Sequence, residues 1–289
     1  MFRKGLRRLI RKVLQGNKIK FLKELALRLP YSRFHKIVGW LFWGEEAIRW
    51  RGITIKVNPG ETHGYYTYFL GGYHQEVIEK LIELCRQESL FVDAGANIGL
   101  LSLSVAYACP RLEVFAFEPE HNVAMRFRAN LELNQSLSYR VHFVEQAVAE
   151  MNSDAFFHPS LDPGDIETGR LLFDKPQPAI DYLVPVVRLD TFFQNIGKYP
   201  DVVKIDVEGA ELRVLQGMSG LFQKGFPKAM LIEVHQPYFS QDALTFKTEI
   251  KTILEQAGYS LSWLDRETWD ALPLPENWPG HLSILAIKK

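Results

Sequence analysis

The sequence predicts an α/β protein whose sheet is mostly parallel and is covered by helices on both faces. From residue 90 onward, short apolar runs typical of buried strands alternate with amphipathic stretches typical of helices. Such alternation is characteristic of parallel strands joined by right-handed helical crossovers. The expected strands cover residues 90–93, 112–118, 140–145, 201–206 and 229–235, with a closing pair at 259–264 and 281–288 of which one is antiparallel; the expected helices cover residues 75–86, 98–108, 121–134, 209–216 and 242–257.

The residues before this alternating region read differently. Residues 1 to about 29 have a helical pattern that ends at Pro30, and the aromatic-rich residues 33–50 predict a second helix. Residues 53–57 alternate in polarity and predict a strand, whereas residues 58–72 predict a loop. We therefore expect a helical N-terminal extension over residues 1–60 and one main domain over residues 61–289.

The charge of the chain is unevenly distributed. The whole sequence has no net charge, but residues 1–20 carry eight basic side chains and no acidic one, which leaves 26 basic against 34 acidic residues elsewhere. A basic amphipathic helix of this kind can lie on an anionic membrane surface as a peripheral contact, or pack on the rest of the protein with its charges in solvent. A nucleic-acid partner is not expected, because no base-reading motif accompanies the basic run.

Composition gives a broad class. Cys85 and Cys109 are the only cysteines, too few for a disulfide framework and without metal-ligand spacing. The sequence shows no apolar run long enough to span a membrane and no signal-peptide pattern, so we expect a cytoplasmic protein.

Acidic residues at the ends of neighbouring strands predict a ligand site at one edge of the sheet. Asp93 ends the first strand and is followed by a turn containing Gly95 and Gly99, which lets a ligand approach the backbone closely. Glu118 follows on the next strand, near the separation at which a carboxylate meets ribose hydroxyls. The Gly-x-Gly-x-x-Gly fingerprint for a pyrophosphate is absent from this turn, so S-adenosylmethionine fits better than NAD. Gln146, just past the strand over 140–145, is a further candidate for cofactor contact.

In this order, the segments FVDAGANIG, AFEPE, VVKIDVEGAEL and LIEVH resemble the FkbM family of S-adenosylmethionine-dependent methyltransferases. The resemblance covers about residues 65 to 240 and implies a Rossmann-like class I methyltransferase fold with a seven-stranded sheet. It also implies O-methylation of a hydroxyl on a small molecule, sugar or glycan. By position, the residues implied to contact the cofactor are Asp93, Gly95, Asn97, Gly99 and Glu118, and those implied to face the transferred methyl are Asp206 and Glu208.

A hydroxyl acceptor must lose its proton, and Asp206, Glu208 and His235 are the candidate bases. Lys204 either neutralises Asp206 or Glu208 or belongs to a structural ion pair. A divalent metal among these carboxylates is conceivable, but the spacing does not require it, so no metal is expected.

Two irregular stretches, residues 60–69 and 151–184, are expected to determine the acceptor. The second is polar, rich in proline and long, which indicates a lid, and its ends at 155–157 and 183–186 are expected to pair as an antiparallel ribbon. Two other functions remain alternatives, a nicotinamide-dependent oxidoreductase and a non-catalytic domain that binds the cofactor or a docking partner.

Overall fold

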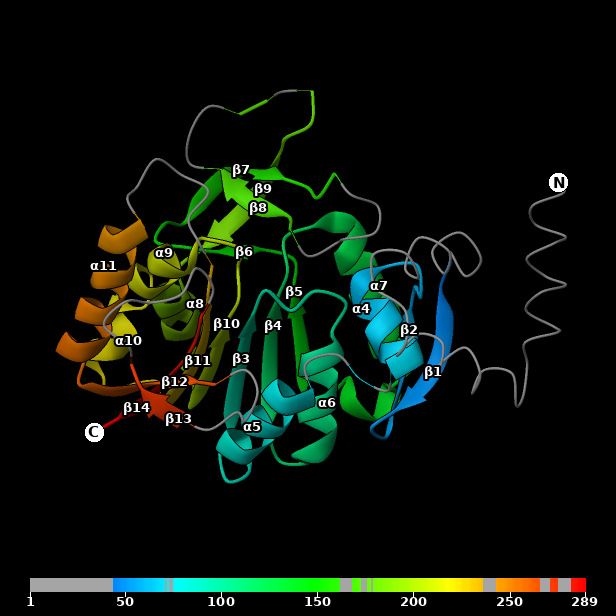
Figure 1. Cartoon of the computed structure of the whole chain (residues 1–289), viewed down its shortest axis with the longest axis horizontal. Helices are drawn as coiled ribbons and strands as arrows, with labels where there is room; N and C mark the ends of the chain where they lie inside the picture. Colours follow the sequence, from blue (N-terminus) through cyan, green and yellow to red (C-terminus); the bar gives the residue numbers. More distant parts are fainter. Residues whose placement is uncertain are drawn as a thin grey trace, which may run out of the picture. The chain divides into compact units, whose positions relative to one another are not determined.

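A computed structural model describes residues 44–70, 72, 75–161, 168–172, 176–177, 179–235, 243–265, 271–274 and 282–289 (Figure 1). The helix expected over residues 1–29 and most of the helix expected over 33–50 lie outside these ranges. The described residues fall into two compact units, of which the smaller holds those up to residue 75 together with residues 160 and 161, and the larger holds residues 76–159 and the described residues from 168 onward. None of the helices in the described ranges combines the length and the apolar content that crossing a membrane requires.

The smaller unit contains a β-hairpin and a short helical segment. Strand β1 (Glu46–Trp50) pairs antiparallel with β2 (Ile53–Val57). The helix predicted over 33–50 is therefore wrong for its last five residues, whose alternating exposure is that of an edge strand. The loop predicted over 58–72 is also partly wrong, because it contains α4 (Thr62–Tyr65) and the π-helical η1 (Tyr66–Leu70).

The main sheet of the larger unit has eight described strands in the order β13-β12-β14-β11-β10-β3-β4-β5. The five strands β11, β10, β3, β4 and β5 are parallel, and β14 runs antiparallel to both of its neighbours. All seven predicted strands are present, and the short edge strand β13 is an eighth. The strands are β3 (Leu90–Ala94), β4 (Glu113–Phe117), β5 (Val141–Val144), β10 (Val202–Ile205), β11 (Ala229–Val234), β12 (Tyr259–Leu264), β13 (Ala271–Pro273) and β14 (Leu282–Lys288).

Helices connect these strands as the alternation predicts. Two short helices were not predicted from the sequence, α8 and α10. For α8, the apolar spacing of Leu189, Phe192, Phe193 and Ile196 is the signal that could have found it. The helices of the larger unit are α5 (Gln75–Cys85), α6 (Leu100–Ala108), α7 (His121–Glu132), the 3₁₀ turn η2 (Gln135–Leu137), α8 (Leu189–Ile196), α9 (Glu211–Gln216), α10 (Ser219–Gln223) and α11 (Ala243–Gln256).

One face of the main sheet forms a large hydrophobic core with helices α8 to α11. Val92 of β3 and Val203 of β10 belong to the same buried cluster as Leu189 of α8. Successive side chains of a strand point to opposite faces, so Asp93 and Lys204 point to the other face of the sheet. Two charged residues thus lie next to the core at the same level of adjacent strands.

A second, four-stranded sheet occupies the region predicted as a lid. It contains β6 (Ala147–Val148), β7 (Ser153–His158), β8 (Arg170–Leu172) and β9 (Tyr182–Val187). The predicted ribbon is confirmed, because β7 and β9 pair antiparallel with Ala155 opposite Val184. Within the larger unit, this sheet lies over the carboxyl ends of β3, β4 and β5 (Figure 1).

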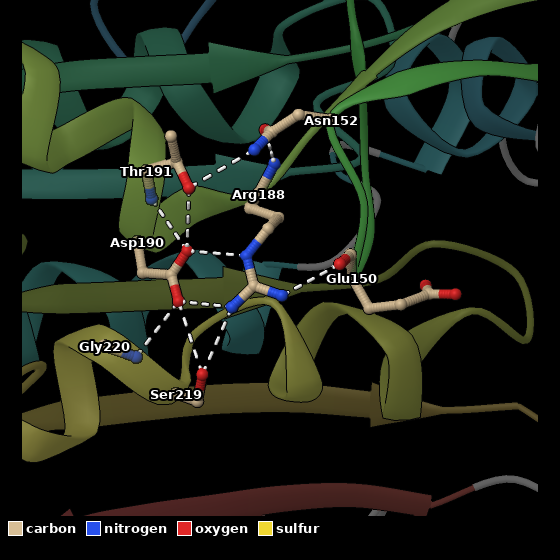
Figure 2. Close-up of polar contacts among 7 residues, drawn as sticks. All are labelled: Glu150, Asn152, Arg188, Asp190, Thr191, Ser219 and Gly220. Atoms are coloured by element: carbon tan, nitrogen blue, oxygen red, sulfur yellow. Dashed lines mark hydrogen bonds and ion pairs between the residues drawn. The ribbon is translucent and has the colours of Figure 1, made fainter.

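Arg188 anchors the base of the small sheet, where β9 leads into α8 (Figure 2). Its guanidinium donates to both carboxylate oxygens of Asp190 at 2.9 and 2.6 Å, and to the backbone carbonyl of Glu150 at 2.8 Å. Asp190 also accepts the backbone N–H of Gly220 at the start of α10. Burial raises the pKa of Asp190, but the hydrogen bond from Arg188 outweighs it and holds the pKa below its usual value. The small sheet is thus joined to α8 and α10 by charge-assisted hydrogen bonds.

Candidate functional site

A tight bend follows β3 and precedes α6. Its backbone φ is +82° at Gly95, +50° at Asn97 and +89° at Gly99. These values lie in the left-handed region, which glycine adopts without strain and most residues with a Cβ do not. A Cβ added at Gly95 would lie 1.8 Å from the backbone oxygen of Asp206. The bend therefore touches the end of β10, and only glycine at position 95 permits that approach.

Glu118 lies at the end of β4 and holds this bend. Its two carboxylate oxygens accept the backbone N–H groups of Asn97 and Glu120, each at 3.0 Å. Burial raises the pKa of Glu118 to about 7, although the two N–H donors favour the charged form. Each carboxylate oxygen has a second lone pair, so two acceptor positions remain. That number matches the two hydroxyls of a ribose, and the residues therefore fit an adenosyl cofactor.

Two further residues lie near the same edge of the sheet. Gln146 follows β5 and is partly buried, and its backbone N–H donates to the carbonyl of Val144. Tyr182 of β9 hydrogen-bonds to the backbone of His121, and burial together with the charges of Glu120 and Glu118 raises its pKa. The small sheet thus brings a phenol to the end of β4, a contribution the sequence did not predict.

Asp93 and Lys204 form a buried ion pair beneath the bend. The Asp93 side chain is fully buried, and one of its oxygens accepts the Ser102 hydroxyl at 2.6 Å. Lys204 Nζ lies 3.4 Å from the other oxygen of Asp93 and 3.1 Å from Asp206. Burial disfavours a charge on Lys204, but Asp206 and Asp93 outweigh it and raise the pKa of the ammonium group.

The three candidate bases come together at the ends of β10 and β11. His235 Nε2 lies 3.5 Å from Glu208 Oε1 and 3.9 Å from Asp206 Oδ1. Its other ring nitrogen, Nδ1, is 3.0 Å from Glu211 Oε1, and Glu211 also accepts the backbone N–H of Gly209. Glu211 is fully buried at the start of α9 and was not among the predicted site residues.

The protonation states in this cluster are strongly coupled. Burial lowers the pKa of His235, but the hydrogen bond to Glu211 and the charges of Asp206 and Glu208 raise it to about 10. Burial also raises the pKa of Glu208 to about 8, although His235 acts in the opposite direction. At neutral pH the imidazole is therefore a cation, and the carboxyl group of Glu208 titrates near the range that suits proton transfer.

The same three residues also have the chemistry of a cation site. One donor atom from each of Asp206, Glu208 and His235 lies within 4.8 Å of the others. However, the ammonium of Lys204 already lies 3.1 Å from Asp206, and His235 is itself cationic. The carboxylates thus receive positive charge from within the chain.

The fold and this edge of the sheet define a class of protein. The seven strands from β5 to β12, with β14 antiparallel between β11 and β12, have the Rossmann-like arrangement of class I methyltransferases. The glycine bend after β3 and the carboxylate after β4 occupy the cofactor edge of that arrangement. S-Adenosylmethionine is the methyl donor of this class.

Comparison with known sequences identifies the family. The chain belongs to the FkbM methyltransferase family, because the model of the Methyltransferase FkbM domain matches residues 93–261. This confirms the resemblance seen in the sequence and does not favour the oxidoreductase or the non-catalytic alternative.

Several named relatives are similar over much of the chain. Methyltransferase 1 of Beauveria bassiana is 27% identical over 215 residues, which are 68% of this chain and 83% of the relative. The hexuronic acid methyltransferase AglP of Haloferax volcanii is 26% identical over 63% of this chain and 70% of its own length. The 2-O-methyltransferase NoeI of Sinorhizobium fredii is 27% identical over 50% of this chain and 62% of its own length.

Among solved structures, a S-adenosylmethionine-dependent methyltransferase from Agrobacterium tumefaciens is 10% identical, with a TM-score of 0.47. The comparison covers 85% of this chain and 70% of the other.

Proposed function

We propose that this protein transfers a methyl group from S-adenosylmethionine to a hydroxyl oxygen of a sugar, glycan or other small molecule. The observation that carries the proposal is the close contact between the glycine bend after β3 and the backbone of Asp206 after β10. This residue is the first of the acid–histidine cluster, which consists of Asp206, Glu208, Glu211 and His235, so a donor bound at the bend would have proton acceptors beside it.

The donor side of the site follows from the geometry of the bend. Gly95, Asn97 and Gly99 would present backbone to the cofactor, and Glu118 would accept hydrogen bonds from the ribose hydroxyls. Gln146 would lie on the adenine side, since it follows the outermost parallel strand. Asp93 is fully buried, so we assign it to holding the bend from below rather than to direct contact with the methionine amino group.

When bound, S-adenosylmethionine supplies a methyl group on a sulfonium, which a nucleophilic oxygen can attack in line. The task of the chain is to align that oxygen and to remove its proton. Glu208 is the proposed proton acceptor, because its pKa of about 8 lies near the operating range. His235 would act as a fixed positive charge that stabilises the neighbouring carboxylates, and Asp206 would orient the acceptor hydroxyl.

The charges around this cluster favour an uncharged acceptor group. Asp206, Glu208 and Glu211 supply carboxylates, whereas His235 and Lys204 supply the cations already paired with them. A further anionic group, brought in by the acceptor, would be repelled at this position. The relatives AglP and NoeI are named for methylation of a hexuronic acid and of a 2-O position, which supports a sugar-like acceptor. We propose that a neutral hydroxyl, rather than a carboxylate, is the reacting group.

No metal ion is part of the proposed reaction, because the cluster supplies its own positive charges. Treatment with a chelator should therefore leave methyl transfer unchanged. A loss of activity that added magnesium or calcium restores would show that the three residues hold a cation instead.

The remaining parts of the chain carry secondary proposals. We propose that residues 1–60 form an extension to a catalytic domain over residues 61–289, that the protein is cytoplasmic, and that nucleic acid is not a partner. Whether the basic residues 1–20 contact membranes or pack on the domain can be decided with vesicles. Cosedimentation with vesicles containing anionic lipid, lost at high salt, would indicate membrane contact.

The function is tested by transfer of a labelled methyl group. The protein is incubated with S-adenosylmethionine carrying a labelled methyl and with a panel of neutral sugars, uronic acids and amines. We expect label on an oxygen of a neutral sugar or similar hydroxyl compound. Asp206→Asn should lower turnover more than cofactor affinity. Glu113→Gln, at the amino-terminal end of β4 and so away from the site, should change neither. Label on nitrogen or carboxylate only, or full activity of Asp206→Asn, would contradict the proposal.

A further inference from the structure

Lys204 is an unusual residue for the middle of a parallel sheet. It lies in β10 between Asp93 of β3 and Leu231 of β11, and it is 4% exposed. Burying a long cationic side chain costs free energy unless every donor is matched. The contacts of Lys204 therefore indicate why the chain places a lysine here.

The ammonium group lies close to three oxygen atoms, of which the Asp93 oxygen is at ion-pair distance and accepts no hydrogen bond. It donates to the carbonyl oxygen of Gly95 at 2.9 Å, and it lies 3.1 Å from Asp206 Oδ2 and 3.4 Å from Asp93 Oδ1. Gly95 belongs to the cofactor bend and Asp206 to the acid–histidine cluster. Lys204 thus contacts both halves of the site while being shielded from solvent.

Asp93, the third group near the lysine, is itself hydrogen-bonded to a helix. Its second oxygen accepts the hydroxyl of Ser102 in α6, so the carboxylate is fixed to that helix. A counter-charge for Asp93 alone would need neither the bond to Gly95 nor the approach to Asp206. The contacts therefore form a chain. Helix α6 holds Asp93, Asp93 holds Lys204, and Lys204 contacts both the bend and Asp206.

We propose that Lys204 is a positioning residue that fixes the glycine bend to Asp206, with Asp93 and Ser102 holding the lysine in place. The inference rests on the proposed function, in which the bend binds the donor and Asp206 meets the acceptor. A rigid link between these two parts would set the distance between methyl and oxygen, to which transfer rates are very sensitive.

The test removes the lysine without leaving a lone buried carboxylate. Lys204→Met alone leaves the buried Asp93 without its cation, which destabilises the fold whatever else the lysine does. The double variant Lys204→Met/Asp93→Asn removes both charges with little change of volume. Asp93→Asn provides the baseline, and Lys198→Met, an ion-pair lysine at the other edge of the sheet, provides the control for loss of a lysine.

Three quantities are measured on correctly folded protein: the affinity for S-adenosylhomocysteine, the amide hydrogen exchange of residues 206–208, and the turnover. Relative to Asp93→Asn, we expect the double variant to bind S-adenosylhomocysteine about tenfold more weakly and to exchange the Asp206 amide faster. Its kcat should fall about 100-fold with the acceptor KM unchanged. Lys198→Met should match the wild-type protein in all three.

A double variant that matches Asp93→Asn within about threefold in affinity and in exchange would overturn the proposal, because Lys204 would then be only a counter-charge. A change confined to the affinity or to the exchange would also overturn it, since the link requires both. These two readouts need no acceptor. A wild-type protein that binds S-adenosylhomocysteine but methylates nothing would therefore refute the proposed function, and the role of Lys204 would still be decided.

Discussion

The affinity for the adenosine part of the cofactor should depend on pH through Glu118. This carboxylate has a pKa of about 7 because it is buried at the end of β4. A ribose hydroxyl donates to the ionised carboxylate better than to the protonated one, so protonation of Glu118 competes with binding. Because burial raises this pKa, the competition falls in the neutral range instead of near pH 4.

The magnitude follows from the titration of one group. With a pKa of about 7, roughly 9% of the free protein is ionised at Glu118 at pH 6 and roughly 91% at pH 8. The dissociation constant should therefore be about tenfold larger at pH 6 than at pH 8, which corresponds to about 1.4 kcal/mol. At pH 7, binding should release about half a proton per site.

The suitable probe is 5′-methylthioadenosine, which has both ribose hydroxyls and no group that titrates between pH 6 and 8. Calorimetry at several pH values, in buffers of different ionisation enthalpy, gives both the affinity and the number of protons released. Glu118→Gln should bind more weakly and without this pH dependence. A dissociation constant that is constant from pH 6 to 8 in the wild-type protein, or one that falls at low pH, would refute the reasoning.

Three further predictions concern the bend, the base and the small sheet. Gly95→Ala places a Cβ 1.8 Å from the backbone oxygen of Asp206, so the bend must move and affinity for S-adenosylhomocysteine should fall at least tenfold, as calorimetry would detect. The kcat of the wild-type protein should rise with pH through about 8 as Glu208 ionises, and Glu208→Gln should lose this rise together with at least 100-fold in kcat. Arg188→Met leaves the buried carboxylate of Asp190 without its cation and should cost about 2 kcal/mol of unfolding free energy, seen as a Tm lower by roughly 4–6 °C.

The predictions for the bend and for the small sheet each have a matched control. Gly197 has the same left-handed backbone, at φ +67°, but a Cβ there would meet no atom within 4 Å, so Gly197→Ala separates backbone strain from the clash. Equal cofactor affinity in the two alanine variants would contradict the close approach at Gly95. Arg213→Met removes a more exposed ion pair with Glu150 and should cost less than about 1 kcal/mol. A Tm for Arg188→Met that equals that of Arg213→Met would contradict the anchoring role.

The strands and the bend could be predicted because local patterns determine them. Continuous apolar runs ending in Asp93, Glu118 and Asp206 indicate buried parallel strands whose polar ends meet at one edge. The hairpin at residues 46–57 was harder, because the aromatic residues around Trp50 pack equally well on a helix or a strand. Only its pairing partner, β2, makes the first segment a strand.

The sequence predicted most residues of the candidate site but not the contacts between them. Asp206, Glu208 and His235 were expected near one another, and the structure brings them within ion-pair distance. Glu211 was missed because it lies at the start of a helix and is recognisable only through its hydrogen bond to His235. Asp206 was among the partners expected for Lys204, but Asp93 could not be chosen from the sequence, since it is more than 100 residues away and reaches the lysine only through the pairing of β3 with β10.

The central claim is that the carboxyl edge of the sheet binds an adenosyl sulfonium donor, and direct titration tests it. The folded wild-type protein is titrated with S-adenosylhomocysteine and, separately, with NAD, and the titrations are repeated on Glu118→Gln. We predict micromolar binding of S-adenosylhomocysteine to the wild-type protein, at least tenfold weaker binding to the variant, and no binding of NAD. Failure of the wild-type protein to bind S-adenosylhomocysteine, or equal binding of NAD, would contradict the claim.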